Sequence, residues 1–139
     1  MKYDYDLIAI GGGSGGLSVV ERAAEYGKKC AVVEAKKLGG TCVNIGCVPK
    51  KVMWFGAHIA EALRDAPDYG FELDVKGFSW AKLVEQRETY IKNINTWFDG
   101  YMEKLGVDVL QGWGRFIDAN TIEVDGKRYS AEVIVISPG

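Results

Sequence analysis

The chain begins with an apolar run, a glycine-rich turn and an amphipathic segment. Residues 7–10 predict a short buried strand. Apolar positions between residues 17 and 24 recur at helical spacing, and Gly27 ends the predicted helix. A second apolar run at 31–33 predicts another strand. This order of strand, turn, helix and strand favours an α/β fold with a parallel sheet.

Two longer periodic segments follow. Residues 52–64 predict a helix with its apolar side chains on one face, and the run 65–68, which contains a proline, ends it. Ser79 is the predicted N-cap of a second helix that Gly106 terminates. The aromatic residues between 90 and 101 belong to the apolar stripe of this helix, and we expect most of them to be core.

The last third of the chain is typical of short strands. Residues 107–110 predict one strand, and 133–136 predict a buried one. Three further runs predict a small antiparallel β-ribbon, and they lie at 115–117, 121–124 and 127–129. Asp125-Gly126 is a favourable hairpin turn between the last two. The pattern therefore predicts one domain over 1–139, in which a parallel sheet with helices carries the ribbon.

The glycine-rich turn contains the spacing G-x-G-x-x-G at Gly11, Gly13 and Gly16. The first glycine permits the tight turn, the second lets the backbone approach a pyrophosphate, and the third allows close packing of helix on strand. Glu34 ends the second strand about 20 residues later, where an acid is expected to bind ribose hydroxyls. Together these features predict a dinucleotide site, and the alternative is a glycine-rich turn without a ligand.

Cys42 and Cys47 lie five positions apart, and we interpret them as a redox-active disulfide. On a regular helix their Cα atoms would be roughly 8.7 Å apart, beyond the ~7 Å that a disulfide bridges. A bridge therefore needs a distorted turn. Gly46 supplies conformational freedom, and Pro49 removes an amide donor one turn into the following helix. The alternatives are a zinc site or a static structural bridge.

The surroundings of the cysteines favour a reactive thiol. Lys50 and Lys51 follow Cys47 by three and four positions, on its helical face, where positive charge and a helix N-terminus stabilise a thiolate. Cys30 opens the second strand and is expected to be a small core residue. His58 is the only histidine, and we expect it to have a surface or packing role.

Composition narrows the possible functions. The net charge of -2 argues against a nucleic-acid-binding face, and no apolar run approaches the ~18 residues of a membrane span. The N-terminus lacks the apolar region of a signal peptide, so a cytoplasmic location is expected. Three cysteines in that compartment fit redox chemistry better than a disulfide framework. No metal site is expected.

These residues resemble the pyridine nucleotide-disulfide oxidoreductases, and within that family the glutathione reductase branch. The resemblance spans the whole chain and is most specific in three blocks, which are GGGSGG at 11–16, GGTCVNIGCVPKKVMW at 39–54 and DYGF at 68–71. A dihydrolipoamide dehydrogenase would typically read Pro-Ser-Lys where this chain has Pro49-Lys50-Lys51. The resemblance implies that 1–139 is the N-terminal part of a Rossmann-like FAD-binding domain, without the NADPH and dimer-interface domains.

The resemblance implies that the dinucleotide is FAD and that NADPH or NADH serves the complete enzyme. The residues that it places at FAD are Gly11, Gly13, Ser14, Gly15, Gly16, Glu34, Thr41, Lys50 and Gly114. Three residues are implied as catalytic. Cys42 would attack the substrate, Cys47 would lie against the flavin ring, and Lys50 would lie near the flavin N5. In FAD-loaded protein Cys42 is therefore expected to be alkylated first.

The implied substrate is a small-molecule disulfide, and its implied contacts are Ser14, Glu21, Lys51 and Tyr90. Two tyrosines of the matching family helix face the substrate, and this chain has Tyr90 and Phe98 there. Glu21 stands where some glutathione reductases carry an arginine that meets a substrate carboxylate. A negative charge at this position suits a disulfide substrate whose carboxylates are amidated or replaced by amines. The alternative is that Glu21 is a surface charge paired with Arg22, Lys28 or solvent.

The expected function is therefore the N-terminal portion of an NAD(P)H-dependent flavoprotein reductase of glutathione disulfide or its amide, serving cell redox homeostasis. The complete enzyme is expected to be a homodimer, and the isolated portion is expected to be inactive alone. Two alternatives stay open: an FAD- or adenosine-nucleotide-binding module without turnover, and a dithiol redox module. The end of the chain departs from the family, since Ser137-Pro138-Gly139 replaces Ala-Thr-Gly and Pro138 cannot donate a backbone hydrogen bond.

Overall fold

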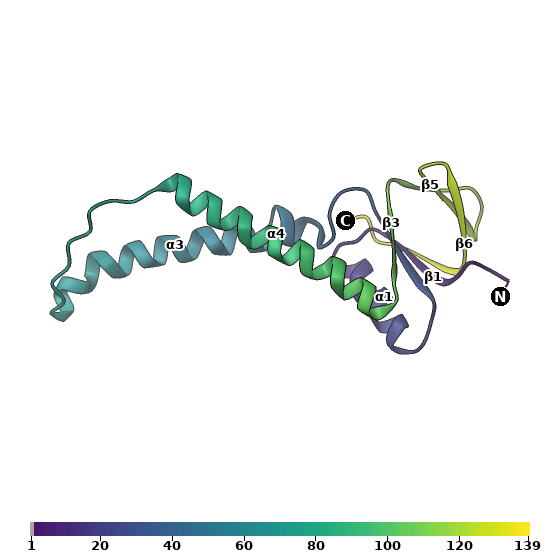
Figure 1. Cartoon of the computed structure of the whole chain (residues 1–139), viewed down its shortest axis with the longest axis horizontal. Coiled ribbons are helices and arrows are strands. Elements are labelled where there is room, and N and C mark those ends of the chain that lie inside the picture. The colour runs from purple at the N-terminus through teal and green to yellow at the C-terminus, as the bar shows by residue number, and fades with distance from the viewer. Residues whose placement is uncertain (1) are drawn as a thin grey trace.

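The computed structural model describes residues 2–139 and has the mixed helix and strand content that the sequence predicts (Figure 1). Its elements in chain order are β1 (Tyr5–Ile10), α1 (Ser14–Glu25), β2 (Cys30–Glu34), α2 (Gly40–Asn44), α3 (Cys47–Asp65), the 3₁₀ helix η1 (Ala66–Tyr69), α4 (Trp80–Leu105), β3 (Asp108–Gln111), β4 (Gly114–Phe116), β5 (Thr121–Val124) and β6 (Lys127–Ile136).

The strands form one sheet in the order β3-β2-β1-β6-β5-β4. The first four in this order are parallel, with Ile8 of β1 opposite Ala31 of β2 and Ile134 of β6. The last three are antiparallel and form the ribbon. The predicted parallel sheet with an antiparallel ribbon is confirmed. The runs at 127–129 and 133–136 are one strand, however, because β6 pairs first with β5 and then with β1.

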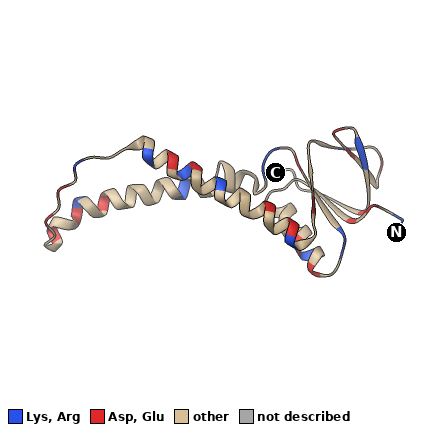
Figure 2. Cartoon of the chain, in the orientation of Figure 1, with Lys and Arg blue, Asp and Glu red and all other residues tan. Residues whose placement is uncertain are grey.

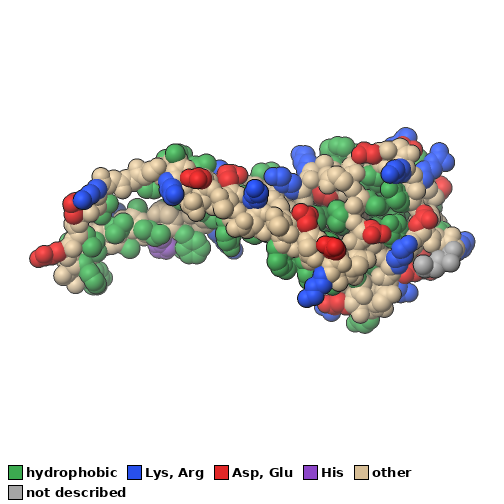
Figure 3. Space-filling view, viewed as in Figure 1, with side chains coloured by type: hydrophobic (Ala, Val, Ile, Leu, Met, Phe, Trp, Pro, Cys, Tyr) green, Lys and Arg blue, Asp and Glu red, His purple; other side chains and the backbone are tan. Residues whose placement is uncertain are grey.

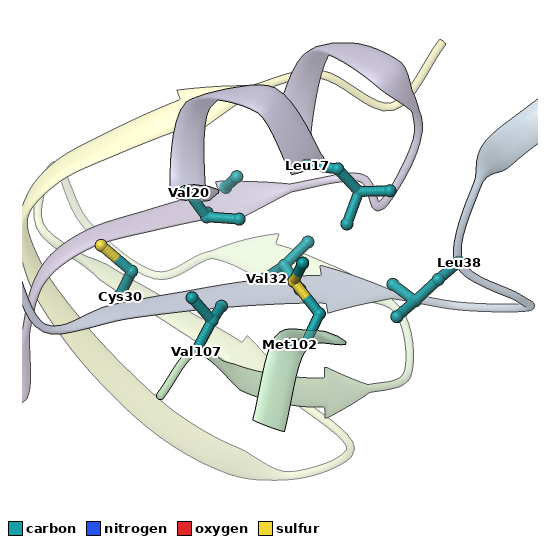
Figure 4. Close-up of a cluster of buried hydrophobic side chains, with 8 residues drawn as sticks. Leu17, Val20, Cys30, Val32, Leu38, Met102 and Val107 are labelled. Carbon is teal, nitrogen blue, oxygen red and sulfur yellow. The ribbon is translucent and has the colours of Figure 1, made fainter. Parts of the chain in front are cut away.

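The two faces of the sheet bury different side chains, because successive residues of a strand point to opposite sides. One face packs against α1 and the C-terminal part of α4, and its buried cluster is Ala9, Leu17, Val20, Cys30, Val32, Leu38, Met102 and Val107 (Figure 4). The other face packs against the ribbon, with Tyr5, Ile8, Ala31, Val33, Ile122, Val124 and Ala131 buried. The prediction that Cys30 is a core residue is confirmed.

Helix α1 lies unusually close to β1. A Cβ at Gly16 would stand 1.8 Å from the carbonyl oxygen of Gly11, and a Cβ at Gly11 would stand 2.0 Å from that of Ser137. Gly11 also has a φ of +110°, which other residues rarely adopt. These two contacts explain the glycines at the first and third positions of the fingerprint.

Helices α3 and α4 form a long arm that projects away from the sheet (Figure 1). No residue of α3 is buried, and its exposed apolar side chains include Trp54, Phe55, Ile59 and Leu63. Residues 52–60 carry no Asp, Glu, Lys or Arg, so charge appears only toward the two ends of the helix (Figure 2). The space-filling view shows the resulting green apolar side chains along the arm (Figure 3).

Two predictions of burial are wrong. The aromatic stripe of α4 is not mostly core, because only Ile91 and Met102 of this helix are buried and Trp97 is 57% exposed. The strand at 133–136 is not buried either, since Ile136 is 68% exposed. Within this strand, Ile134 and Val135 pack against the buried clusters, whereas Val133 and Ile136 do not.

The predicted ends of the elements are largely correct. The Ser79 hydroxyl accepts a hydrogen bond from the Lys82 amide at 3.2 Å, and Gly106 ends α4 in the left-handed conformation. Asp125 and Gly126 both have positive φ, as a type I′ turn requires. The helix predicted over 52–64 continues from the second cysteine, because α3 begins at Cys47. Within residues 2–139 no helix combines the length and apolar character needed to cross a membrane.

Candidate functional site

The candidate site lies at the edge of the sheet where the parallel strands end. Because β1, β2, β3 and β6 run in the same direction, the segments that follow them meet at this edge. Hydrogen bonds join these segments to their neighbours: Gly11 N donates to Val33 O at 2.8 Å, and Ser137 N donates to Ile10 O at 2.8 Å. Gly112 N donates to the Glu34 carbonyl at 2.9 Å. The edge is therefore a fixed framework.

The N-terminus of α1 opens onto this edge without a side-chain cap. Its N-cap is Gly13, and Ser14 and Gly15 are exposed in the first turn. Their amides have no acceptor within the helix, so they are available to an anion. A Cβ at Gly13 would meet only the Gly40 Cα, at 3.7 Å, so the space beside this glycine is open. An open, uncapped helix start of this kind suits a pyrophosphate.

Glu34 lies beside the glycine turn in a fixed orientation. Its Oε2 accepts a hydrogen bond from Gly12 N at 2.9 Å, and its Oε1 accepts one from Lys36 N at 2.7 Å. A carboxylate oxygen has two lone pairs, so each retains capacity for a ribose hydroxyl. Gly114, also predicted at the cofactor, lies at the same edge, where its Cβ would stand 3.2 Å from Val33 Cγ1.

The two cysteines lie on different helices, with Cys42 in α2 and Cys47 at the first position of α3. The predicted distortion is confirmed, since the helix breaks at residues 45–46. Gly46 is needed there for space rather than for a positive φ, because a Cβ would stand 2.8 Å from Thr41 O. Pro49 occupies the first turn of α3, where an amide has no helical acceptor.

The two thiols differ in acidity. The hydrogen bond from Cys42 to Cys47 lowers the pKa of the Cys47 thiol, and the backbone amide of Cys47, Lys50 and Lys51 lower it further. The same hydrogen bond raises the pKa of the Cys42 thiol, and burial adds to this effect. The pair is therefore asymmetric, and Cys47 is the more acidic thiol. All three cysteines of residues 2–139 are free thiols, so formation of the disulfide stays a prediction.

Two asparagines that the sequence analysis missed hold the dithiol turn. Asn44 Nδ2 donates to the carbonyl oxygens of Gly40 at 2.9 Å and Leu38 at 3.1 Å. Asn95, from α4, donates to Asn44 Oδ1 at 3.0 Å and to the same Leu38 oxygen at 3.1 Å. These contacts tie α2 to the arm, two residues from Cys42. Asn95 Oδ1 is buried and accepts no hydrogen bond from the described residues.

Glu21 has a partner that neither sequence interpretation named. The Tyr101 hydroxyl donates to Glu21 Oε1 at 2.5 Å, and this bond raises the pKa of the tyrosine. The pairing of Glu21 with Arg22 is wrong, because Arg22 binds Glu25 at 2.9 Å. The contact fixes one oxygen of the Glu21 carboxylate across the gap between α1 and α4. It was hidden from the sequence because the two residues are far apart along the chain.

The other predicted residues are distributed around this centre. Thr41, Lys50 and Lys51 are exposed next to the cysteines, and Tyr90 is exposed on α4. Phe98 is partly buried and packs against the core cluster beside α1. His58 is exposed on α3 with Glu61 Oε2 3.5 Å from its Nδ1, which confirms a surface role.

The donor set at the edge fits a dinucleotide. The uncapped start of α1 and the open space at Gly13 suit a pyrophosphate. The fixed Glu34 carboxylate, next along the sheet edge, suits the ribose. Among residues 2–139, no three His, Cys, Asp or Glu side chains come close enough together to form a metal site.

Comparison with known proteins gives three findings. The family model described as pyridine nucleotide-disulphide oxidoreductase matches residues 5–139. A glutathione reductase of Nostoc sp. is 37% identical over 139 residues, which cover 100% of this chain and 30% of that protein. A glutathione reductase of Yarrowia lipolytica is 40% identical over 149 aligned residues, covering 97% of this chain and 32% of that protein. The chain thus spans about a third of the length of these relatives.

Limited alkylation with iodoacetamide at neutral pH should label Cys47 before Cys42 when no flavin is added. Cys47 is exposed and its pKa is lowered, whereas Cys42 is half-buried and its pKa is raised. Replacing both Lys50 and Lys51 with glutamine should slow the labelling of Cys47 by roughly twofold to fivefold, because both lysines lower the pKa of its thiol. Lys82→Gln, on α4, is the matched control. Faster labelling of Cys42 would contradict the assigned acidities.

Proposed function

Because this chain belongs to the pyridine nucleotide-disulphide oxidoreductase family, we propose that it binds FAD and carries the redox dithiol of a flavoprotein disulfide reductase. The observation that carries the proposal is that the helix break brings together Cys42 and Cys47, two thiols of unequal acidity, beside the uncapped start of α1. The α1 amides would hold the pyrophosphate and Glu34 the adenosine ribose. Ser14, Gly15 and Thr41 are exposed where they would line the rest of the cofactor.

Bound FAD would supply the two-electron chemistry that connects a reduced nicotinamide, NADPH or NADH, with the cysteine pair. The chain's own residues would carry out the thiol chemistry. Cys47 would be the thiolate, because the hydrogen bond from Cys42, and after it Lys50 and Lys51, lower the pKa of its thiol. Cys42 would attack a disulfide after passing its proton to Cys47. These roles follow the family order of the two cysteines.

The dithiol reaction is a balanced exchange. The Cys42 thiolate attacks one sulfur of the substrate disulfide, a Cys42–substrate mixed disulfide forms, and the other half of the substrate leaves as a thiolate that takes up a proton. Cys47, once deprotonated, then attacks Cys42 and releases the second half as a thiol. The substrate is reduced by two electrons, and Cys42 and Cys47 are oxidised to a disulfide. In the complete enzyme a second domain and a partner subunit are proposed to supply the nicotinamide site and a general acid.

We further propose that the substrate is an oxidised glutathione whose glycine carboxylates are amidated. Glu21 supports this, because its carboxylate is held by Tyr101 and carries negative charge where a free substrate carboxylate would be repelled. An amide N–H can instead donate to the second carboxylate oxygen. Unmodified glutathione disulfide, the substrate in the names of the two relatives, is the other candidate.

Binding of FAD is the first test. Titrating the chain with FAD should yield a yellow protein with quenched flavin fluorescence, and Gly13→Ala should weaken binding by about tenfold because its methyl group enters the space beside the helix start. The fold should tolerate this methyl, so the melting temperature serves as the check. Gly100→Ala, in an open part of α4, should bind FAD as the wild type does. No binding of FAD by the wild-type chain would reject the proposal.

The substrate proposal is tested in the dithiol half-reaction. The reduced chain is mixed with glutathione disulfide or with glutathione amide disulfide, and the two rate constants are compared. Glu21→Arg should shift their ratio toward glutathione disulfide by at least about threefold, roughly 0.7 kcal/mol. Glu25→Arg makes the same charge change one helical turn away and should shift the ratio less. An unchanged ratio of the two rate constants in Glu21→Arg would contradict the substrate role and leave Glu21 only its structural contact with Tyr101.

A further inference from the structure

Trp113 is a large aromatic side chain that is exposed at the candidate site. It lies between β3 and β4, and 75% of it is exposed. Gln111, two residues earlier, lies opposite Glu34 in the sheet, and Gly112 N donates to the Glu34 carbonyl at 2.9 Å. The indole is therefore attached to the backbone directly beside the acid proposed to hold the ribose.

The backbone on both sides of Trp113 is constrained. Gly112 has a φ of +138°, and a Cβ there would stand 2.7 Å from Asp125 Oδ1. A Cβ at Gly114 would stand 3.2 Å from Val33 Cγ1. These contacts fix the segment against the ends of the strands, while no aromatic ring among residues 2–139 stacks on the indole. A rigid backbone thus presents a large π surface that this chain itself does not cover.

The order of groups in a dinucleotide assigns a partner to this surface. The inference rests on the proposed FAD function, in which the pyrophosphate lies at α1 and the ribose at Glu34. The base is attached to the far side of that ribose, so it extends past β2 toward β3, the next strand of the sheet. Residues 112–114 continue from that strand. We propose that Trp113 stacks on the adenine ring of FAD and is a cofactor-binding residue of this chain.

The chemistry of the two rings supports the assignment. An indole face against a purine is a favourable stack, and removing such an aromatic side chain typically weakens base binding by about tenfold, that is, by roughly 1.4 kcal/mol. Stacking needs an aromatic ring but no particular hydrogen bond, so phenylalanine retains much of it. Pyrimidines present a smaller face, so the site should prefer adenine nucleotides over uridine nucleotides.

The test titrates the full chain with ADP, which carries the adenine, ribose and pyrophosphate without the flavin. Trp113→Ala should raise the Kd for ADP about tenfold, Trp113→Phe by threefold or less, and Trp80→Ala, an exposed tryptophan at the start of α4, should leave it unchanged. Trp113→Ala should also reduce the preference for ADP over UDP. ADP should quench tryptophan emission of the wild type, and this quenching should be lost in Trp113→Phe although ADP still binds.

The outcomes separate this inference from the proposed function. Equal ADP affinity in Trp113→Ala and the wild type would overturn the stacking role while FAD binding stands. Failure of the wild-type chain to bind either FAD or ADP would overturn the proposed function and the inference together. Trp113 is exposed and packs on no core residue cluster, so its variants should unfold at the wild-type temperature, and a matched melting curve confirms that a changed Kd reports binding.

Discussion

The close contact between α1 and β1 is the constraint on which the site depends. Gly16 brings the helix so near that a single methyl group would overlap the Gly11 carbonyl, which stands 1.8 Å from the Cβ position. This contact places the uncapped start of α1 at the edge of the sheet. Gly13 and Gly40 then approach so closely that a Cβ at Gly40 would stand 2.8 Å from the Gly13 Cα. Through that second contact, α2 and its cysteine are located beside the helix start.

The position of the helix break sets the chemistry of the cysteines. An unbroken helix would keep Cys42 and Cys47 apart, whereas the break at Gly46 lets one thiol donate to the other. The start of α3 and Lys51 favour negative charge on both thiols, but the hydrogen bond between them lowers the pKa of Cys47 and raises that of Cys42, and Lys50 acts on Cys47. The Asn44 and Asn95 amides hold the turn from the opposite side, through the Leu38 carbonyl. Backbone geometry and charge thus assign different roles to two chemically identical side chains.

Much of the fold and of the candidate site could be predicted from local signals in the sequence. The glycine spacing, the strand-ending Glu34 and the cysteine spacing each act over a few residues, and the expected parallel sheet and ribbon are confirmed. Tertiary contacts were not predictable in the same way. Tyr101 is 80 residues from Glu21 and Asn95 is 51 from Asn44, so no periodicity reveals either hydrogen bond. The apolar stripe of α4 indicated a core, but a stripe does not show whether a second layer covers it.

The most direct measurement is peptide mapping without reduction after the chain is equilibrated in glutathione redox buffers. Cys42 and Cys47 should be linked in oxidising buffer and free in reducing buffer, with the change reversible in both directions. Cys30 should stay a thiol throughout, because it is buried in the core and burial raises its pKa. A bridge to Cys30, a metal ion bound at Cys42 and Cys47, or failure of these two thiols to link would contradict a redox-active pair.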